Sequence, residues 1–171
     1  MFGTDEILDL ASTINEALDV NQRRKLGYTP VYLAAAFRRL STGELLVKHG
    51  ANINTVGGKF GSPLHAASYS GYSKVVESLL QLSADVNCGM ELESSGLFGT
   101  PLRTASLLNF HSIVRLLLDK GAKVDFCGPY GDALQAAATN GHISAVRLLL
   151  QEGANVNQQA GFYGSALQAA A

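Results

Sequence analysis

A six-residue string recurs along this chain at intervals of about 33 residues. Every copy has a polar first residue, an apolar third residue and alanine in sixth place, and the copies begin at Thr29, Ser62, Thr100, Asp132 and Ser165. The spacings between successive starts are 33, 38, 32 and 33 residues. A period of this length predicts a solenoid, in which each unit buries its apolar face against its neighbours. Because solenoids present extended surfaces, the period favours a binding function over an enzymatic one.

The composition is that of a folded protein with little net charge. Of the 171 residues 47% are apolar, and the formal net charge is −1. This charge provides no long-range attraction to nucleic acid or to anionic lipid, so we expect neither as a partner. Basic residues gather near the start of the chain, and we interpret them as a solvated face. They are Arg23, Arg24, Lys25, Arg38 and Arg39.

The start of the chain and its cysteines predict a cytoplasmic protein, with a nuclear location left open. The first ten residues contain three acidic and no basic side chains, unlike a secretory signal. No apolar run approaches the length of a membrane span. The two cysteines, Cys88 and Cys127, fall in loops of successive units. A disulfide between them is conceivable there, but two free thiols are the preferred interpretation.

The second unit shows how each repeat is expected to fold. Ser62 is a suitable N-cap, and Pro63 suits the first helical position because its missing N–H is not needed there. The short helix that follows ends at Gly71. A second helix is predicted over residues 73–82, where apolar residues are spaced to form one stripe. Each unit is therefore predicted to contain a helix, a turn, a second helix and a projecting loop.

The chain resembles the ankyrin repeat family in several elements that keep one register. The family's T-P-L-H-x-A opening is present as Ser62–Ala67, and the Gly-His turn between its helices as Gly141-His142. Its closing Leu-Leu-Leu and Gly-Ala-Asp-Val-Asn strings match Leu148–Asn157, with asparagine for the aspartate. The resemblance implies an all-α ankyrin-repeat solenoid of stacked helix-turn-helix units with projecting hairpin-like loops. It also implies that His65 shares hydrogen bonds with Ser62.

A finer resemblance concerns the last two copies of the opening string. Tyr130–Ala137 and Tyr163–Ala170 look like an ankyrin subtype found in large fungal proteins. In those proteins the array often follows a NACHT-type nucleotide-binding domain. The resemblance implies that such an array acts as the sensor end of a larger protein.

We place the repeat array at residues 27–171 and an N-terminal capping helix at 1–26. An amphipathic helix is predicted from Thr4 to about Leu18, and its expected role is to cap the first unit. A degenerate repeat or a partner-binding helix stays open for this segment. The units are expected at about 27–59, 60–97, 98–129 and 130–160, with a partial unit at 161–171. The partial unit favours a fragment of a longer protein or a truncated gene product.

Unit one departs furthest from the family pattern. Arg38-Arg39 stands in place of Gly-His, and Gly43 lies inside the predicted second helix. The glycine costs about 1 kcal/mol relative to alanine. Ser41 and Glu44 have the spacing of a capping box, which is expected to offset part of that cost. The loop that joins units two and three, residues 88–99, is longer than the others, and such insertions often lie on a binding face.

The residues give no sign of an enzyme, a cofactor or a metal site. Gly57-Gly58-Lys59 is followed by Phe60 and lacks the upstream glycine of a Walker A phosphate loop. The histidines do not cluster at the spacing of metal ligands; they are His49, His65, His111 and His142. We therefore expect a binding protein with no cofactor, no metal and no catalytic residues.

Two sets of residues are candidates for contact with a protein partner. The first is an aromatic residue that precedes a glycine in each loop, namely Phe60, Phe98, Tyr130 and Tyr163. A residue repeated in every unit either packs its loop against a neighbour or builds an apolar contact strip, and both interpretations stay open. The second set lies at the ends of the first helices and varies between units, which favours a role in specificity. It comprises Phe37, Tyr69, Leu107 and Leu108.

We therefore expect a protein–protein interaction module that binds a partner protein through its concave face and loops. One alternative is the sensor or scaffold portion of a larger NACHT-type NTPase signalling protein, whose catalytic domain lies outside this chain. A third interpretation is an architectural spacer without a tight partner. The spacer predicts that substitutions at Tyr69, Leu107 and Leu108 are tolerated.

Overall fold

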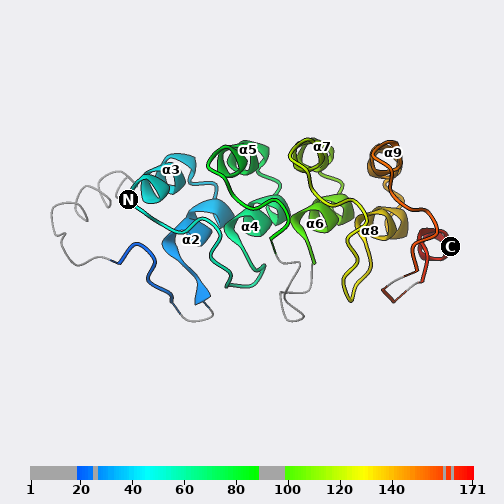
Figure 1. The fold of residues 1–171 in the computed structure, drawn as a ribbon, viewed down its shortest axis with the longest axis horizontal. Coiled ribbons are helices and arrows are strands. Elements are labelled where there is room, and N and C mark those ends of the chain that lie inside the picture. The colour runs from blue at the N-terminus through cyan, green and yellow to red at the C-terminus, as the bar shows by residue number, and fades with distance from the viewer. Residues whose placement is uncertain (1–18, 25–26, 89–98, 160, 163) are drawn as a thin grey trace.

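The computed structural model describes residues 19–24, 27–88, 99–159, 161–162 and 164–171, which form two rows of helices (Figure 1). The inner row holds the first helix of each unit: α2 (Pro30–Ala36), α4 (Pro63–Tyr69), α6 (Pro101–Leu107), α8 (Ala133–Thr139) and α10 (Ala166–Ala170). The outer row holds the second: α3 (Leu40–Lys48), α5 (Ser73–Gln81), α7 (His111–Asp119) and α9 (Ile143–Gln151). In Figure 1 the loops project below the inner row. The predicted all-α repeat solenoid is confirmed.

Some expectations fall on residues outside the described ranges. They are the helix predicted from Thr4 to Leu18, most of the long loop at 88–99, and the aromatic residues Phe98 and Tyr163.

The first helices begin where the recurring string predicts. The side-chain oxygen of each N-cap accepts a hydrogen bond from the backbone N–H three residues later, at 2.7–3.3 Å, and the caps are Thr29, Ser62, Thr100, Asp132 and Ser165. The first three are followed by proline, as expected for the first helical position. In α8 and α10 alanine replaces the proline, and Gln135 and Gln168 close a capping box instead.

The core is shared between units and lies between the two rows. The apolar third residue of the string and the alanine in sixth place are buried in units two to four, for example Leu64 and Ala67. Small alanines let neighbouring inner helices approach closely, and leucines of the outer helices, such as Leu117 and Leu149, fill the space above them. Fully burying one such leucine contributes about 1.5–3 kcal/mol. Each unit therefore depends on its neighbours for most of its stability.

The turn between the two helices of a unit places one residue in the left-handed region. Gly71 and Gly141 hold this place in units two and four, with φ of 74° and 65°. Arg38 and Asn109 hold it in units one and three, both with φ of 59°. Left-handed backbone is costly for a residue with a Cβ, so the absence of glycine at residue 38 weakens unit one, as its sequence indicates.

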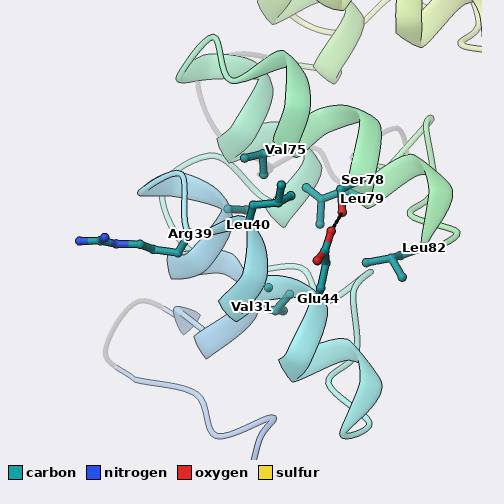
Figure 2. A pocket seen from close by; sticks show the side chains of 10 residues that line it. Val31, Arg39, Leu40, Glu44, Val75, Ser78, Leu79 and Leu82 are labelled. Atoms are coloured by element: carbon teal, nitrogen blue, oxygen red, sulfur yellow. Dashed lines mark hydrogen bonds between the residues drawn. The ribbon is translucent and has the colours of Figure 1, made fainter. Parts of the chain in front are cut away.

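The capping box predicted at Ser41 and Glu44 is wrong. Helix α3 begins at Leu40, so Ser41 lies inside the helix, and its N-cap Arg39 makes no side-chain capping bond. The Glu44 carboxylate instead accepts a hydrogen bond from Ser78 Oγ of α5 at 3.0 Å, as Figure 2 shows. Glu44 therefore makes its side-chain contact with the next unit and not with Ser41 of its own helix. Gly43 does lie within α3, as predicted.

Successive units are also joined by a ladder of hydrogen bonds at the turns that close them. In each case a side-chain Oδ1 accepts from a backbone N–H of the next unit. The pairs are Asn54 with Asp85 (2.8 Å), Asn87 with Lys123 (2.9 Å) and Asp125 with Asn155 (2.8 Å). We refer to these pairs as the Asx ladder. The ladder fixes the register of the stack along one edge.

The same turn occurs once more, ahead of unit one. Asn21 accepts a hydrogen bond from the backbone N–H of Asn52 at 2.7 Å, and its own N–H donates to Asp19 Oδ1 at 2.9 Å. Val20, between them, packs on the apolar residues of unit one. Residues 19–21 thus make the contacts with unit one that the closing turn of each unit makes with the next.

Candidate partner-binding surface

The ends of the inner helices lie in a row along the stack. Ser70 Oγ donates to the carbonyl oxygen of Ala36 at 3.3 Å, which joins the ends of α2 and α4. Asn140 Nδ2 donates to the carbonyl oxygen of Leu107 at 3.3 Å, which joins the ends of α6 and α8. The ends of α2 and α4, and those of α6 and α8, are therefore held side by side.

The four helix-end candidates are all accessible on this surface. Phe37 is 67% exposed, while Tyr69, Leu107 and Leu108 are half-buried. The side chains differ in size and polarity from unit to unit. The row therefore has the variation that specific recognition of a partner needs.

The loop aromatics do not share one environment. The Phe60 ring stacks on Tyr69 with 4.1 Å between ring centroids, and the Phe60 N–H donates to the Tyr32 hydroxyl at 3.1 Å. The Tyr130 side chain is 49% exposed, and the Arg103 guanidinium lies 5.9 Å from its ring centroid. Phe60 is thus in part a packing residue that supports Tyr69, while Tyr130 presents its ring to solvent. The structure brings together Phe60 and Tyr69 from the two candidate sets.

One feature of the loops was missed in the sequence, namely the role of the fourth residue of the recurring string. Tyr32 accepts from the Phe60 N–H, and Arg103 Nη2 donates to the carbonyl oxygen of Tyr130 at 2.7 Å. Gln135 Nε2 donates in the same way to the carbonyl oxygen of Gly164 at 2.6 Å. Each of these side chains therefore holds the loop that follows about 28 residues later. The sequence signal for this role is the polar or hydrogen-bonding side chain in fourth place of every copy of the string.

His65 holds the same place in unit two, and it shares a hydrogen bond with Ser62 as the resemblance implies. Its backbone N–H donates to Ser62 Oγ at 3.1 Å. The imidazole Nε2 lies 2.7 Å from Thr104 Oγ1 of the next unit, a contact that the resemblance does not imply. Burial, together with repulsion from Arg103, lowers the pKa of His65 to about 3. His65 is thus a neutral side chain that joins α4 to α6.

The two cysteines lie in loops after α5 and α7, where Cys88 is buried and Cys127 is half-buried. Burial raises the pKa of the Cys88 thiol to about 11, and it also raises the pKa of Cys127. Both cysteines are free thiols, and Ser62 Oγ lies 2.8 Å from Cys88 Sγ. A raised pKa disfavours the nucleophilic thiolate. Among the described residues, no group of three or more His, Cys, Asp or Glu side chains could hold a metal ion.

Two hollows differ sharply in size. The first lies between α3 and α5, has a volume of about 10 Å³, and is lined by residues such as Leu40, Glu44, Val75 and Leu79 (Figure 2). That volume holds about one water molecule, so this hollow is a packing gap between two units and is too small for a ligand. The second, about 440 Å³, is open to solvent on α9 and is lined by Ile143, Val146, Arg147, Leu150 and Gln151. It lies on the outermost described helix of the outer row.

Comparisons with known proteins agree with this architecture. The family model described as "Ankyrin repeats (3 copies)" matches residues 2–90 and 86–160. A putative ankyrin repeat protein of fowlpox virus, FPV024, is 33% identical over 86 residues, which are 49% of this chain and 14% of the viral protein. Alpha-latrotoxin-Lg1a of Latrodectus geometricus is 30% identical over 86 residues, 50% of this chain and 6% of the toxin. The chain thus matches only a small part of the length of these relatives. No helix in the described ranges is long and apolar enough to cross a bilayer.

Proposed function

The chain belongs to the ankyrin repeat family, whose repeats mediate protein–protein interactions, and we propose that it binds a partner protein on the row of inner-helix ends and the adjacent loops. It acts by binding and without catalysis, which is typical of the family. We place it in the cytoplasm, where the free thiols of Cys88 and Cys127 are stable.

One observation carries this proposal. Adjacent inner-helix ends are tied together by hydrogen bonds, yet the side chains they present differ from unit to unit. Phe37, Tyr69 and the Leu107-Leu108 pair supply apolar or aromatic area that is not needed to bury the core. Aromatic and large apolar residues supply much of the energy of protein interfaces. A rigid frame with variable accessible side chains is what a recognition surface requires.

The test is an affinity capture from a lysate of the source organism with a triple variant. Tyr69→Ala, Leu107→Ala and Leu108→Ala are combined, and circular dichroism first establishes that the variant keeps the helicity of the wild type. A matched control alters three exposed residues of the outer row, Lys74→Ala, His111→Ala and Ser112→Ala. We expect a partner that the wild type and the control retain and the triple variant loses. Equal capture by all three would contradict the proposed surface, and capture by none would favour a spacer.

A second candidate function is the sensor or scaffold portion of a larger NTPase protein. It is supported by the strings Tyr130–Ala137 and Tyr163–Ala170, which resemble the arrays of NACHT-type proteins. The relatives are also much longer than the segment that matches this chain. The matched segment makes up 6–14% of their length. Reading the gene upstream of this chain tests the idea. A Walker A motif in the same frame would support it, and a stop codon directly upstream would contradict it.

A further inference from the structure

The loops ahead of units one and two bring positive charge together. Arg23, Arg24 and Lys59 all have exposed side chains. Arg23 Nη1 donates to the carbonyl oxygen of Val56 at 3.2 Å, which holds the first loop against the second. The two loops also pack closely through Gly58, because a Cβ there would lie 2.8 Å from the ring of Tyr28. The segment that carries Arg23 and Arg24 is therefore held against the loop that carries Lys59.

Aromatic side chains continue this surface toward the ends of the inner helices. The Lys59 Nζ lies 5.4 Å from the centroid of the Phe60 ring, which is stacked on Tyr69. Next to Tyr69, the bond from Ser70 Oγ to Ala36 joins the end of α4 to that of α2, where Phe37 is exposed. We refer to the whole as the basic–aromatic patch. It consists of Arg23, Arg24, Phe37, Lys59, Phe60 and Tyr69.

Carboxylates of the same two units lie elsewhere in the described structure. Glu44 and Glu77 are on the outer helices α3 and α5, and Glu44 is hydrogen-bonded to Ser78. Asp19 and Asp85 belong to the closing turns of the Asx ladder. Among the described residues, the two loops outside these turns and the inner-helix ends carry no carboxylate side chain. Counted over the described residues, the patch thus carries three cations and no carboxylate, on a chain whose net charge is −1.

We propose that the basic–aromatic patch binds an acidic segment of a partner protein that also carries an aromatic or large aliphatic side chain. This inference rests on the proposed function and specifies its partner. Carboxylates of the segment pair with Lys59 and the two arginines, which speeds association and selects against basic partners. The apolar side chain packs on Phe37 and beside Tyr69, whose contacts supply the lasting part of the affinity.

A protein segment fits this patch better than a single-stranded nucleic acid. Binding of bases depends on aromatic faces that are open for stacking. Here Phe60 is stacked on Tyr69, and the ammonium group of Lys59 lies over its ring. Phe37 is the widely exposed ring of the patch, at 67%. One exposed aromatic side chain can contact a single apolar side chain of a peptide. It cannot stack several successive bases.

The experiment uses a fluorescent synthetic peptide of alternating glutamate and leucine with one central phenylalanine, titrated with the full chain and followed by anisotropy. The double variant Arg23→Glu, Lys59→Glu is compared with the control Lys120→Glu, Arg147→Glu, which reverses two exposed cations away from the patch. We expect the patch variant to weaken binding about tenfold or more, with the control within about twofold of the wild type. Binding of the wild type should also weaken as salt rises, because these charges are exposed.

A second variant, Phe37→Ser, separates the apolar contact from the charges and should weaken binding without changing its salt dependence. Equal affinity for a peptide with lysine in place of glutamate would overturn the proposal, as would equal losses in patch and control variants. Tighter binding of a single-stranded oligonucleotide of equal charge would assign the patch to nucleic acid instead. If a natural partner needs Tyr69 and Leu107 but tolerates reversal at Arg23 and Lys59, the proposed function stands and this inference fails.

Discussion

At the scale of single residues, His65 links the stability of the stack to pH. Its imidazole is buried between α4 and α6 and has a pKa of about 3, against an ordinary value of 6.5. Below pH 6.5 the unfolded chain binds a proton at this residue and the folded chain does not. Stability present above pH 6.5 is therefore lost as the pH falls toward 3, by up to about 1.4 kcal/mol for each pH unit. Urea unfolding between pH 7 and about 4.5 measures this slope.

The variant His65→Gln provides the control, because glutamine keeps a donor and an acceptor but does not titrate in this range. It should show a shallower loss of stability than the wild type over the same pH window. Burial raises the pKa of Asp132, which acts in the opposite direction, and because both proteins carry Asp132 its effect cancels in the comparison. Identical slopes for the two proteins would contradict the assignment of the effect to His65.

Gly43 offers a stabilising substitution within α3. Its backbone is helical, and an added Cβ would lie 3.8 Å from the Cβ of Ala34, an ordinary contact distance. Gly43→Ala should therefore raise the free energy of unfolding by about 1 kcal/mol. Gly71→Ala is the matched opposite case, since Gly71 has φ of 74° and a Cβ there would lie 2.8 Å from the Phe110 ring. A urea midpoint that falls for both variants would show that α3 is packed more tightly than the structure indicates.

Residue-scale features were predictable where they depend on neighbours in sequence. Ser62 and Pro63 define a helix start by local chemistry, and the helix begins there. The partners of His65 and Glu44 were not predictable, because they are Thr104 and Ser78 in the next unit. A sequence with one repeat period shows which residues are equivalent. It does not show which side chains reach across to a neighbour.

At the scale of elements, the Asx ladder should contribute stability between units. Asn87 accepts from the Lys123 N–H at 2.9 Å and donates to the carbonyl oxygen of Gly121 at 3.3 Å. Asn87→Ala should lower the free energy of unfolding by about 1 kcal/mol. The structure describes no bond from the Asn157 side chain to another unit, so Asn157→Ala is the matched control. Equal effects of the two substitutions in urea unfolding would mean that the ladder is not stabilising.

The structural role of the segment ahead of unit one can be tested through the same ladder. Its role as a cap stays a prediction, and so does the alternative of a degenerate repeat. The bond from the Asn52 N–H to Asn21 favours the repeat, because residues 19–21 contact unit one as a closing turn does. The family model also begins at residue 2. We therefore expect Asn21→Ala to destabilise the chain as much as Asn87→Ala does, whereas a negligible effect would favour a separate cap.

At the scale of the whole molecule, stability should fall toward α9 because this helix lacks a described neighbour on one side. Leu80 of α5 is 8% exposed, and Leu150 at the equivalent place in α9 is 41% exposed. Leu80→Ala should cost about 2–5 kcal/mol, and Leu150→Ala less than about 1 kcal/mol. Urea unfolding of the two variants tests this gradient. Comparable losses would contradict a stack in which each unit is stabilised mainly by its neighbours.

The architecture of the whole stack could be predicted from the sequence, but its binding surface only in part. The recurring string fixes the first helices, and its apolar third residue and its alanine identify the core. The helix-end positions Phe37 and Tyr69 follow from the same alignment. Their neighbours on the surface do not, because the stacking of Phe60 on Tyr69 and the approach of Arg23 to Val56 depend on how loops fold against one another.

We propose that a partner protein contacts the inner-helix ends of this chain. Site-specific photocrosslinking tests it most directly. A photoreactive phenylalanine analogue replaces Tyr69 in one sample and the exposed outer-row residue Lys74 in another, and each protein is irradiated in a lysate of the source organism. We expect a discrete crosslinked protein from position 69 and none from position 74. The same product from position 74, or a product from that position alone, would contradict it.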